Sequence, residues 1–267
     1  MFNRIIKQLC AASHLWMLVI TTALIASHAK ADGSPDMGMT VLSSATGGSI
    51  TVFYPTRSAQ TEFKPGPFTL SLARDGQLML GNRRLMVFSH GSGGAPWPMA
   101  DLARSFVAAG YTVAIPEHDG DNWRDMRLVG PASWKLRPVE VSRAIDAMQQ
   151  DTRFAPLIDF DRVGVYGTSA GGLTALVLGG GKWSPANFKR YCLANMAKDF
   201  AACVGLIVQL KGNWGDAIKL TLASWVHRLS FGDETLYGHQ DPRIKAVLAS
   251  VPMAVPFDLT TLAKPET

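Results

Sequence analysis

A Gly-x-Ser-x-Gly motif between an apolar strand and an apolar helix constrains this chain more than any other feature. The motif is Gly167-Thr168-Ser169-Ala170-Gly171. A strand that turns sharply into a helix can present a serine hydroxyl at the tip of the turn, provided that glycines stand two positions before and after it. We therefore predict that Ser169 is the nucleophile of an acyl-transfer reaction. The alternative is a structural glycine-rich turn that matches the pattern by chance.

A second glycine-rich loop follows an earlier apolar strand and reads Ser89-His90-Gly91-Ser92-Gly93-Gly94. Backbone N–H groups that are fixed before reaction stabilise the oxyanion of a tetrahedral intermediate well. We expect Ser92 and Ala170 to supply these donors. A loop without a ligand is the alternative. A phosphate loop is disfavoured because the Gly-Lys-Ser/Thr ending is missing.

Strands and helices alternate along the chain, which predicts an α/β fold with a mostly parallel sheet and helices on both faces. The chain has 267 residues, 47% of them hydrophobic, enough for one sizeable core. Residues 183–239 look mostly helical and are a candidate lid or insertion after the nucleophile helix. The predicted strands are 37–42, 49–54, 85–89, 111–115, 162–166 and 244–251, a polar loop is expected up to Asn82, and helices are expected to begin near Pro98, Pro138 and Leu173.

The N-terminus has the pattern of an export signal. Arg4 and Lys7 precede an apolar stretch, residues 15–26, and Ala29-Lys30-Ala31 is a small-x-small cleavage pattern. We predict a signal peptide over 1–31 with cleavage after Ala31, a hydrolase domain over 32–267, and a periplasmic or secreted protein. The stretch is short for a membrane span, and an uncleaved anchor is the alternative.

Removal of this signal changes the charge balance. The whole chain carries a net charge of +5, and three basic residues but no acid leave with the signal, so the mature chain has 23 basic and 21 acidic residues. Aromatic residues are not interleaved with a basic stripe, which argues against nucleic-acid binding.

Two cysteines, Cys192 and Cys203, remain after cleavage. In an oxidising compartment they are predicted to form a disulfide that closes a short loop, the alternative being two small buried side chains. Metal ligands do not occur at recognisable spacing, so no metal and no cofactor are predicted.

Taken together, these segments resemble the α/β-hydrolase superfamily, and within it the dienelactone-hydrolase-like and platelet-activating-factor-acetylhydrolase-like group. The resemblance extends from about Met37 onward and implies the fold and acyl-transfer chemistry. Dienelactone hydrolases carry a cysteine nucleophile, so Ser169 favours a serine esterase. The matching segments are Tyr54-Pro55-Thr56, Phe88-Ser89-His90-Gly91-Ser92-Gly93-Gly94, Gly164-Val165-Tyr166-Gly167-Thr168-Ser169-Ala170-Gly171-Gly172 and Asp241-Pro242-Arg243-Ile244-Lys245-Ala246-Val247.

The resemblance implies an acid and then a histidine after the serine, with the histidine in a loop behind the last strand of a longer chain. Only one strand clearly follows Ser169, and residues 262–267 look like the beginning of another. We therefore expect a C-terminally truncated domain whose sheet has an open edge and uncovered apolar faces. The alternative is that residues 183–239 supply the missing parts.

No histidine fits the role of the general base in this order. His90 belongs to the oxyanion loop, His118 ends a strand before Ser169 and is expected at the mouth of the site, and His239 precedes the last strand. His227 is expected on a helix surface, and His14 and His28 lie in the signal. Asp258 is the candidate acid, whereas Asp233 and Asp241 are typical of turns.

The sequence thus predicts an exported serine hydrolase that cleaves small-molecule carboxylic esters. A non-catalytic hydrolase-like binding protein or an inactive fragment is the alternative, because the histidine of the triad is not found, and a peptidase on the same fold is a third. Four tryptophans could line a substrate pocket, although ordinary core or surface packing is the favoured interpretation of each: Trp97, Trp123, Trp134 and Trp214.

Overall fold

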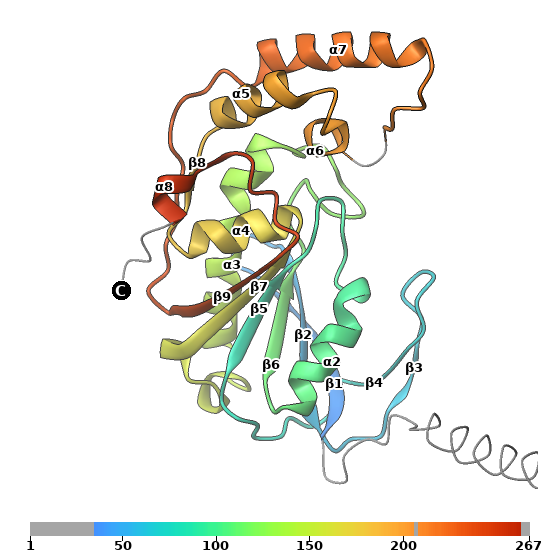
Figure 1. Cartoon of the computed structure of the whole chain (residues 1–267). Helices are drawn as coiled ribbons and strands as arrows, with labels where there is room; N and C mark the ends of the chain where they lie inside the picture. Colours follow the sequence, from blue (N-terminus) through green and yellow to red (C-terminus); the bar gives the residue numbers. More distant parts are fainter. Residues whose placement is uncertain (1–34, 206–207, 263–267) are drawn as a thin grey trace, which may run out of the picture. The chain divides into compact units, whose positions relative to one another are not determined.

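The computed structural model describes residues 35–205 and 208–262; the predicted signal peptide, 1–31, lies outside the described residues. Within the described part, eight strands form one mixed sheet in the order β3-β4-β1-β2-β6-β5-β7-β9 (Figure 1). The strands are β1 (Asp36–Ser43), β2 (Ser49–Thr56), β3 (Thr61–Phe63), β4 (Leu70–Arg74), β5 (Leu85–Ser89), β6 (Thr112–Pro116), β7 (Val163–Thr168) and β9 (Ile244–Ser250).

Four neighbouring strands, β6, β5, β7 and β9, are mutually parallel, while β2 runs antiparallel to both β1 and β6. The six strands predicted from the sequence are confirmed, each to within two residues at either end. Their apolar runs form strands because helices cover both faces, so that every residue of β5 and β6 is buried.

The polar segment up to Asn82 is not a plain loop, as the sequence had suggested. It contains the antiparallel pair β3 and β4, and β4 joins the sheet beside β1. Leu70 and Leu72 are buried while Ser71 between them is exposed, which is the alternation of a half-buried strand. Three alternating residues among prolines and glycines are too short a pattern to stand out in the sequence.

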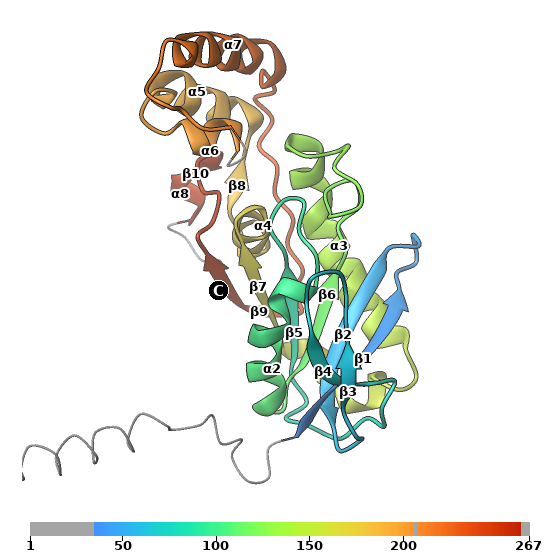
Figure 2. The ribbon, with the colours of Figure 1, turned by 90° about the vertical axis from the view of Figure 1, so that its right-hand side faces the viewer.

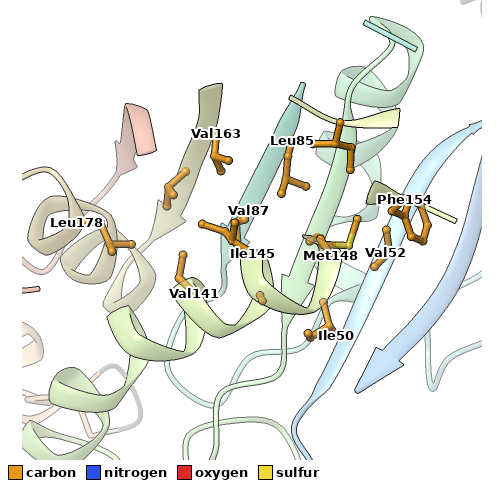
Figure 3. Packing of buried hydrophobic residues seen from close by; sticks show 14 of the residues in the cluster. Ile50, Val52, Leu85, Val87, Val141, Ile145, Met148, Phe154, Val163 and Leu178 are labelled. Carbon is orange, nitrogen blue, oxygen red and sulfur yellow. The ribbon is translucent and has the colours of Figure 1, made fainter. Parts of the chain in front are cut away.

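Helices cover both faces of the sheet, as predicted. α2 (Ala100–Ala108) lies on one side of β5 and α3 (Pro131–Gln150) on the other (Figure 2), and α4 (Ala170–Leu178) packs in the same core cluster as α3. Val141, Ile145 and Met148 of α3 point toward the strands in Figure 3 and share one core cluster with them. Their spacing of about one helical turn places them on a single face.

The predicted start of α3 at Pro138 is wrong, because the helix begins seven residues earlier at Pro131. Proline suits the first turn, where its missing N–H has no intrahelical partner. Pro138 lies inside the helix and is buried. The helix continues past it because Trp134 and Arg137 on one side and Val141 on the other are all anchored in the interior.

Residues 183–239 are mostly helical, as predicted, and lie beyond the carboxyl ends of the central strands (Figures 1 and 2). They contain β8 (Lys182–Trp183), α5 (Pro185–Asn195), α6 (Phe200–Val204) and α7 (Gly215–Ser230). A disulfide between Cys192 and Cys203 joins α5 to α6, with Cα atoms 5.6 Å apart. Within the described ranges, none of the helices is long and apolar enough to cross a bilayer.

β9 forms one edge of the sheet. Leu248 of β9 is 50% exposed, and Val251 just after it is 79% exposed. β10 (Phe257–Asp258) pairs with β8 in a separate two-stranded sheet. The segment beginning at residue 262 was expected to approach a further strand, but Leu262 ends the short helix α8 (Leu259–Leu262), and residues 263–267 are not among those described.

Candidate active site

Ser169 stands at the turn between β7 and α4 in a conformation that few non-glycine residues adopt. Its φ is +56° and its ψ is −116°, and the residue is exposed. A residue held in such a region costs roughly 1–3 kcal/mol of strain and persists only where its surroundings impose it. The turn therefore holds the serine outward at the end of a buried strand, where a substrate can reach it.

Two glycines of the motif make this turn sterically possible. A Cβ atom at Gly167 would lie 1.9 Å from the Gly171 carbonyl oxygen, and one at Gly171 would lie 1.9 Å from the Ser89 carbonyl oxygen. Both neighbours are backbone atoms and cannot rotate away. Only glycine fits either position, which is the physical reason for the spacing of the motif.

The edge strand β9 fixes the same turn from the other side. The Ser169 N–H donates to the carbonyl oxygen of Ser250 at 3.2 Å, and the Met253 N–H donates to the carbonyl oxygen of Ser169 at 3.1 Å. A serine elbow thus follows β7, which lies between β5 and the edge strand β9 in the parallel part of the sheet. The chain has an α/β-hydrolase fold. The α/β fold class predicted from the sequence, with helices on both faces of a mostly parallel sheet, is confirmed.

The loop after β5 lies directly against the elbow. A Cβ atom at Gly91 would be 3.5 Å from the Cβ of Ser169. Ala170 is the first residue of α4, so its N–H has no partner within the helix. In the loop, the Gly93 N–H donates to Asp121, and the Gly94 N–H donates to the carbonyl of Gly91. The Ser92 N–H makes no hydrogen bond to any described residue.

A buried ion pair that the sequence analysis missed holds this loop in place; we call it the Asp121–Arg137 clamp. Both side chains are fully buried, with Arg137 Nη2 2.9 Å from Asp121 Oδ2. Arg137 donates to the carbonyls of His90 at 2.6 Å and Gly91 at 3.3 Å. Asp121 accepts from the Ser92 hydroxyl at 2.6 Å. The clamp therefore binds the loop through both its carbonyls and its side chains.

The electrostatics of the clamp are consistent with a charged pair. Burial opposes the charge of Asp121, but Arg137 and the hydroxyls of Ser133 and Ser92 outweigh it and lower the pKa of that carboxyl. Burial lowers the pKa of Arg137, although a guanidinium stays protonated in proteins. The sequence signal for this ion pair was an arginine on the mostly apolar inner face of α3, three residues after Trp134 and four before Val141.

Beneath the loop, Ser89, His118 and Glu140 form a chain that resembles a catalytic triad. The Ser89 hydroxyl lies 2.7 Å from His118 Nε2, and His118 Nδ1 lies 2.6 Å from Glu140. Ser89 and His118 are completely buried, so no substrate carbonyl can approach this hydroxyl. His118 was expected at the mouth of the site and is instead part of the interior.

Burial also determines the charge of the two histidines near the loop. Desolvation, followed by the neighbouring His118 and Arg137, lowers the pKa of His90 to about 3. Desolvation lowers the pKa of His118 as well. The His90 and His118 rings lie 4.8 Å apart, and His90 Nδ1 is 2.8 Å from the Gly91 carbonyl oxygen. Both are therefore neutral structural groups near neutral pH.

The remaining candidates for base and acid have other partners. His227 is not on a helix surface, as expected, but is buried against Phe188 and Phe231 with Nε2 3.0 Å from the Cys203 carbonyl oxygen. His239 Nε2 contacts the Ser142 hydroxyl at 2.9 Å. Asp258 accepts two hydrogen bonds from Thr260, which lower the pKa of the carboxyl. In residues 35–205 and 208–262, no histidine hydrogen-bonds to Ser169 or to Asp258.

The four tryptophans do not gather around Ser169 as one pocket. Trp134 is buried against Trp183 and Phe188, and Trp97 packs on Phe63. Trp123 is 53% exposed and contacts the glycine-rich loop after β5, because its backbone N–H donates to the Gly94 carbonyl while its indole donates to Glu117. Trp214 is 84% exposed beside α7. In the described part of the chain, no group of three or more His, Cys, Asp or Glu residues could hold a metal ion.

Comparison with known proteins gives short and distant matches. No family model matches the chain. It is 27% identical over 73 residues to dipeptidyl peptidase 8 of Mus musculus and of Homo sapiens; this segment covers 27% of the chain and 8% of each relative. The matched segment thus spans less than a tenth of the length of these curated relatives.

Two of the solved structures that resemble the chain are similarly distant. A ferulic acid esterase from Streptomyces cinnamoneus has a TM-score of 0.44 at 19% identity, over 55% of this chain and 56% of that one. The Francisella virulence factor BioJ has a TM-score of 0.37 at 12% identity, over 55% of this chain and 40% of that one.

Proposed function

We propose that this protein is an exported serine hydrolase that cleaves carboxylic esters through an acyl-enzyme at Ser169. The observation that carries the proposal is the conformation of Ser169, exposed at a positive φ between β7 and α4 with the glycine-rich loop against it. Strain of this kind at an exposed, reactive side chain is characteristic of functional sites. We further propose that the chain belongs to the dienelactone-hydrolase-like group, with serine in place of cysteine.

In the proposed reaction, Ser169 Oγ attacks the ester carbonyl carbon while its proton passes to a general base. The oxyanion of the tetrahedral intermediate accepts hydrogen bonds from the N–H groups of Ala170 and Ser92. The intermediate expels the alcohol, which takes up the proton, and leaves an acyl group on Ser169. Water then attacks the acyl carbonyl, the acid is released, and the serine regains its proton.

The test is labelling of the full chain with a fluorophosphonate probe, which reacts only with an activated serine. We expect the wild-type chain and the control Ser105→Ala to be labelled and Ser169→Ala not to be. Ser105 is exposed on α2 and its hydroxyl donates to the carbonyl of Asp101 in the same helix, so removal of the hydroxyl leaves the site intact. The pH dependence of the labelling rate gives the pKa of the base.

A second candidate function is a binding protein that keeps the elbow without catalysis. The observation that favours it is that the described histidines all have partners other than Ser169. Absence of labelling and of p-nitrophenyl ester turnover, in a sample whose circular dichroism shows it to be folded, would support this alternative and refute the esterase. Turnover of a p-nitroanilide instead of the matching ester would indicate a peptidase.

A further inference from the structure

Helix α7 exposes an apolar stripe along almost its whole length. Six large apolar side chains are 42–84% exposed, and five of them follow one another at steps of three or four residues, which places them on one face. We call this set the α7 stripe. Its members are Trp214, Ile218, Leu222, Trp225, Val226 and Leu229.

The opposite face of the same helix holds it to the protein. Leu220 and Ala223 pack into the cluster that contains Phe188 and the Cys192–Cys203 disulfide. His227 is buried on that face too. The inner face of α7 therefore packs against the rest of the protein, whereas the α7 stripe on its outer face is apolar surface exposed to solvent.

The size of the stripe exceeds what scattered surface residues explain. Trp214 is 84% and Trp225 60% exposed. Because an aromatic side chain presents about 150–250 Å², the two indoles together offer on the order of 200–350 Å². The four aliphatic members add to this, and contiguous patches above a few hundred Å² on soluble proteins mark interaction sites.

The charges around the stripe indicate what it contacts. Asp216 is the one acid in residues 208–231, and it is buried and paired with Lys219 at 2.9 Å. Lys211 before the helix and Arg228 near its end are exposed. A helix with tryptophan and leucine on its free face, cations at its ends and no exposed acid has the composition of an interfacial membrane helix.

We propose that the α7 stripe binds the surface of an anionic lipid bilayer, with Trp214 and Trp225 inserted between the headgroups. The helix lies beyond the carboxyl ends of the central strands, which is the end where Ser169 stands (Figure 1). Docking through α7 brings that end of the sheet toward the lipid. The proposal does not require Ser169 to be reactive, and its test measures binding alone.

The experiment uses quenching of tryptophan fluorescence by brominated phosphatidylglycerol vesicles. Residues 15–26 are apolar themselves, so the signal must be assigned to α7. We expect quenching of the full chain to drop strongly in the Trp214→Phe/Trp225→Phe variant, which keeps the apolar face but removes both α7 indoles. Undiminished quenching in that variant overturns the proposal.

Matched charge variants on α7 test the stripe itself. Leu222→Glu places a carboxylate in its centre, while Ala217→Glu places the same charge on an exposed position outside it. We expect half-maximal quenching of Leu222→Glu to need at least about tenfold more lipid, and that of Ala217→Glu to change by no more than about twofold. Equal effects of the two variants contradict lipid docking.

Two further outcomes would refute the proposal. A dimer in sedimentation velocity without lipid that Leu222→Glu abolishes would show that the stripe joins two copies of the chain. Equally strong α7 quenching by brominated phosphatidylcholine vesicles, unaffected by salt, would show that the exposed cations play no part and that an anionic surface is not required.

Discussion

The Asp121–Arg137 clamp allows the sharpest prediction, because one substitution removes several buried contacts at once. Arg137→Met keeps most of the volume of the side chain but deletes the guanidinium. Asp121 then remains as a buried carboxylate without its cation, the carbonyl of His90 loses the Arg137 donor, and the carbonyl of Gly91 keeps only its donors other than Arg137. We expect the free energy of unfolding to fall and the glycine-rich loop after β5 to become less well fixed.

The magnitude follows from the burial of the pair. Breaking a buried ion pair by removing one partner costs about 3–5 kcal/mol. Asp121 keeps the hydroxyls of Ser92 and Ser133 and the N–H of Gly93 as donors, which places the expected loss near the lower end. For a domain of this size, about 3 kcal/mol lowers the melting temperature by roughly 6–12 °C.

The assay combines thermal unfolding with fluorophosphonate labelling at a temperature where the variant is folded. Arg127→Met is the matched control, because Arg127 is 64% exposed and pairs with surface aspartates, so we expect less than about 1 kcal/mol. Labelling of Ser169 in Arg137→Met should slow by at least about tenfold if the loop supplies an oxyanion donor. A melting temperature within a degree or two of the wild type would refute the reasoning. Unchanged labelling would show that the clamp only stabilises the fold.

Two other predictions follow from the geometry of the elbow and of the buried histidines. Gly171→Ala drives a Cβ atom into the carbonyl of Ser89, so it should lower the free energy of unfolding in urea by about 2 kcal/mol or more and abolish labelling of Ser169. Gly179→Ala is the control, because its Cβ meets only ordinary contacts and should change neither quantity. Equal effects of the two variants would contradict the steric argument. Burial lowers the pKa of His90 to about 3 and lowers the pKa of His118 too. As the pH falls, both imidazoles therefore stay neutral in the folded chain while they take up protons in the unfolded chain. Above about pH 6.5 these histidines therefore cost the folded chain no stability. Acidification to about pH 4.5 should lower the free energy of unfolding by at least about 2 kcal/mol. A urea midpoint that does not move over this range would be inconsistent with neutral buried histidines.

The short-range features of this chain could be predicted from its sequence. The strands, the helix after Ser169 and Gly167 depend on apolar periods and steric limits that act within a few residues. A Cβ atom at Gly167 would meet the Gly171 carbonyl within the same turn, whereas the glycine at 171 is required by the Ser89 carbonyl of the neighbouring strand β5. The fold class followed from the alternation of these local elements.

The surroundings of the site were decided by the tertiary structure. His118 contacts Ser89, 29 residues away in the sequence, and Arg137 donates to the His90 carbonyl, 47 residues away. No local sequence pattern therefore predicts either contact. The same holds for His227, which lies on the inner face of α7 while Trp225 lies on the outer one, although both belong to one apolar stretch. A helical period shows that a helix has faces, but only the packing of the whole chain selects which face is buried.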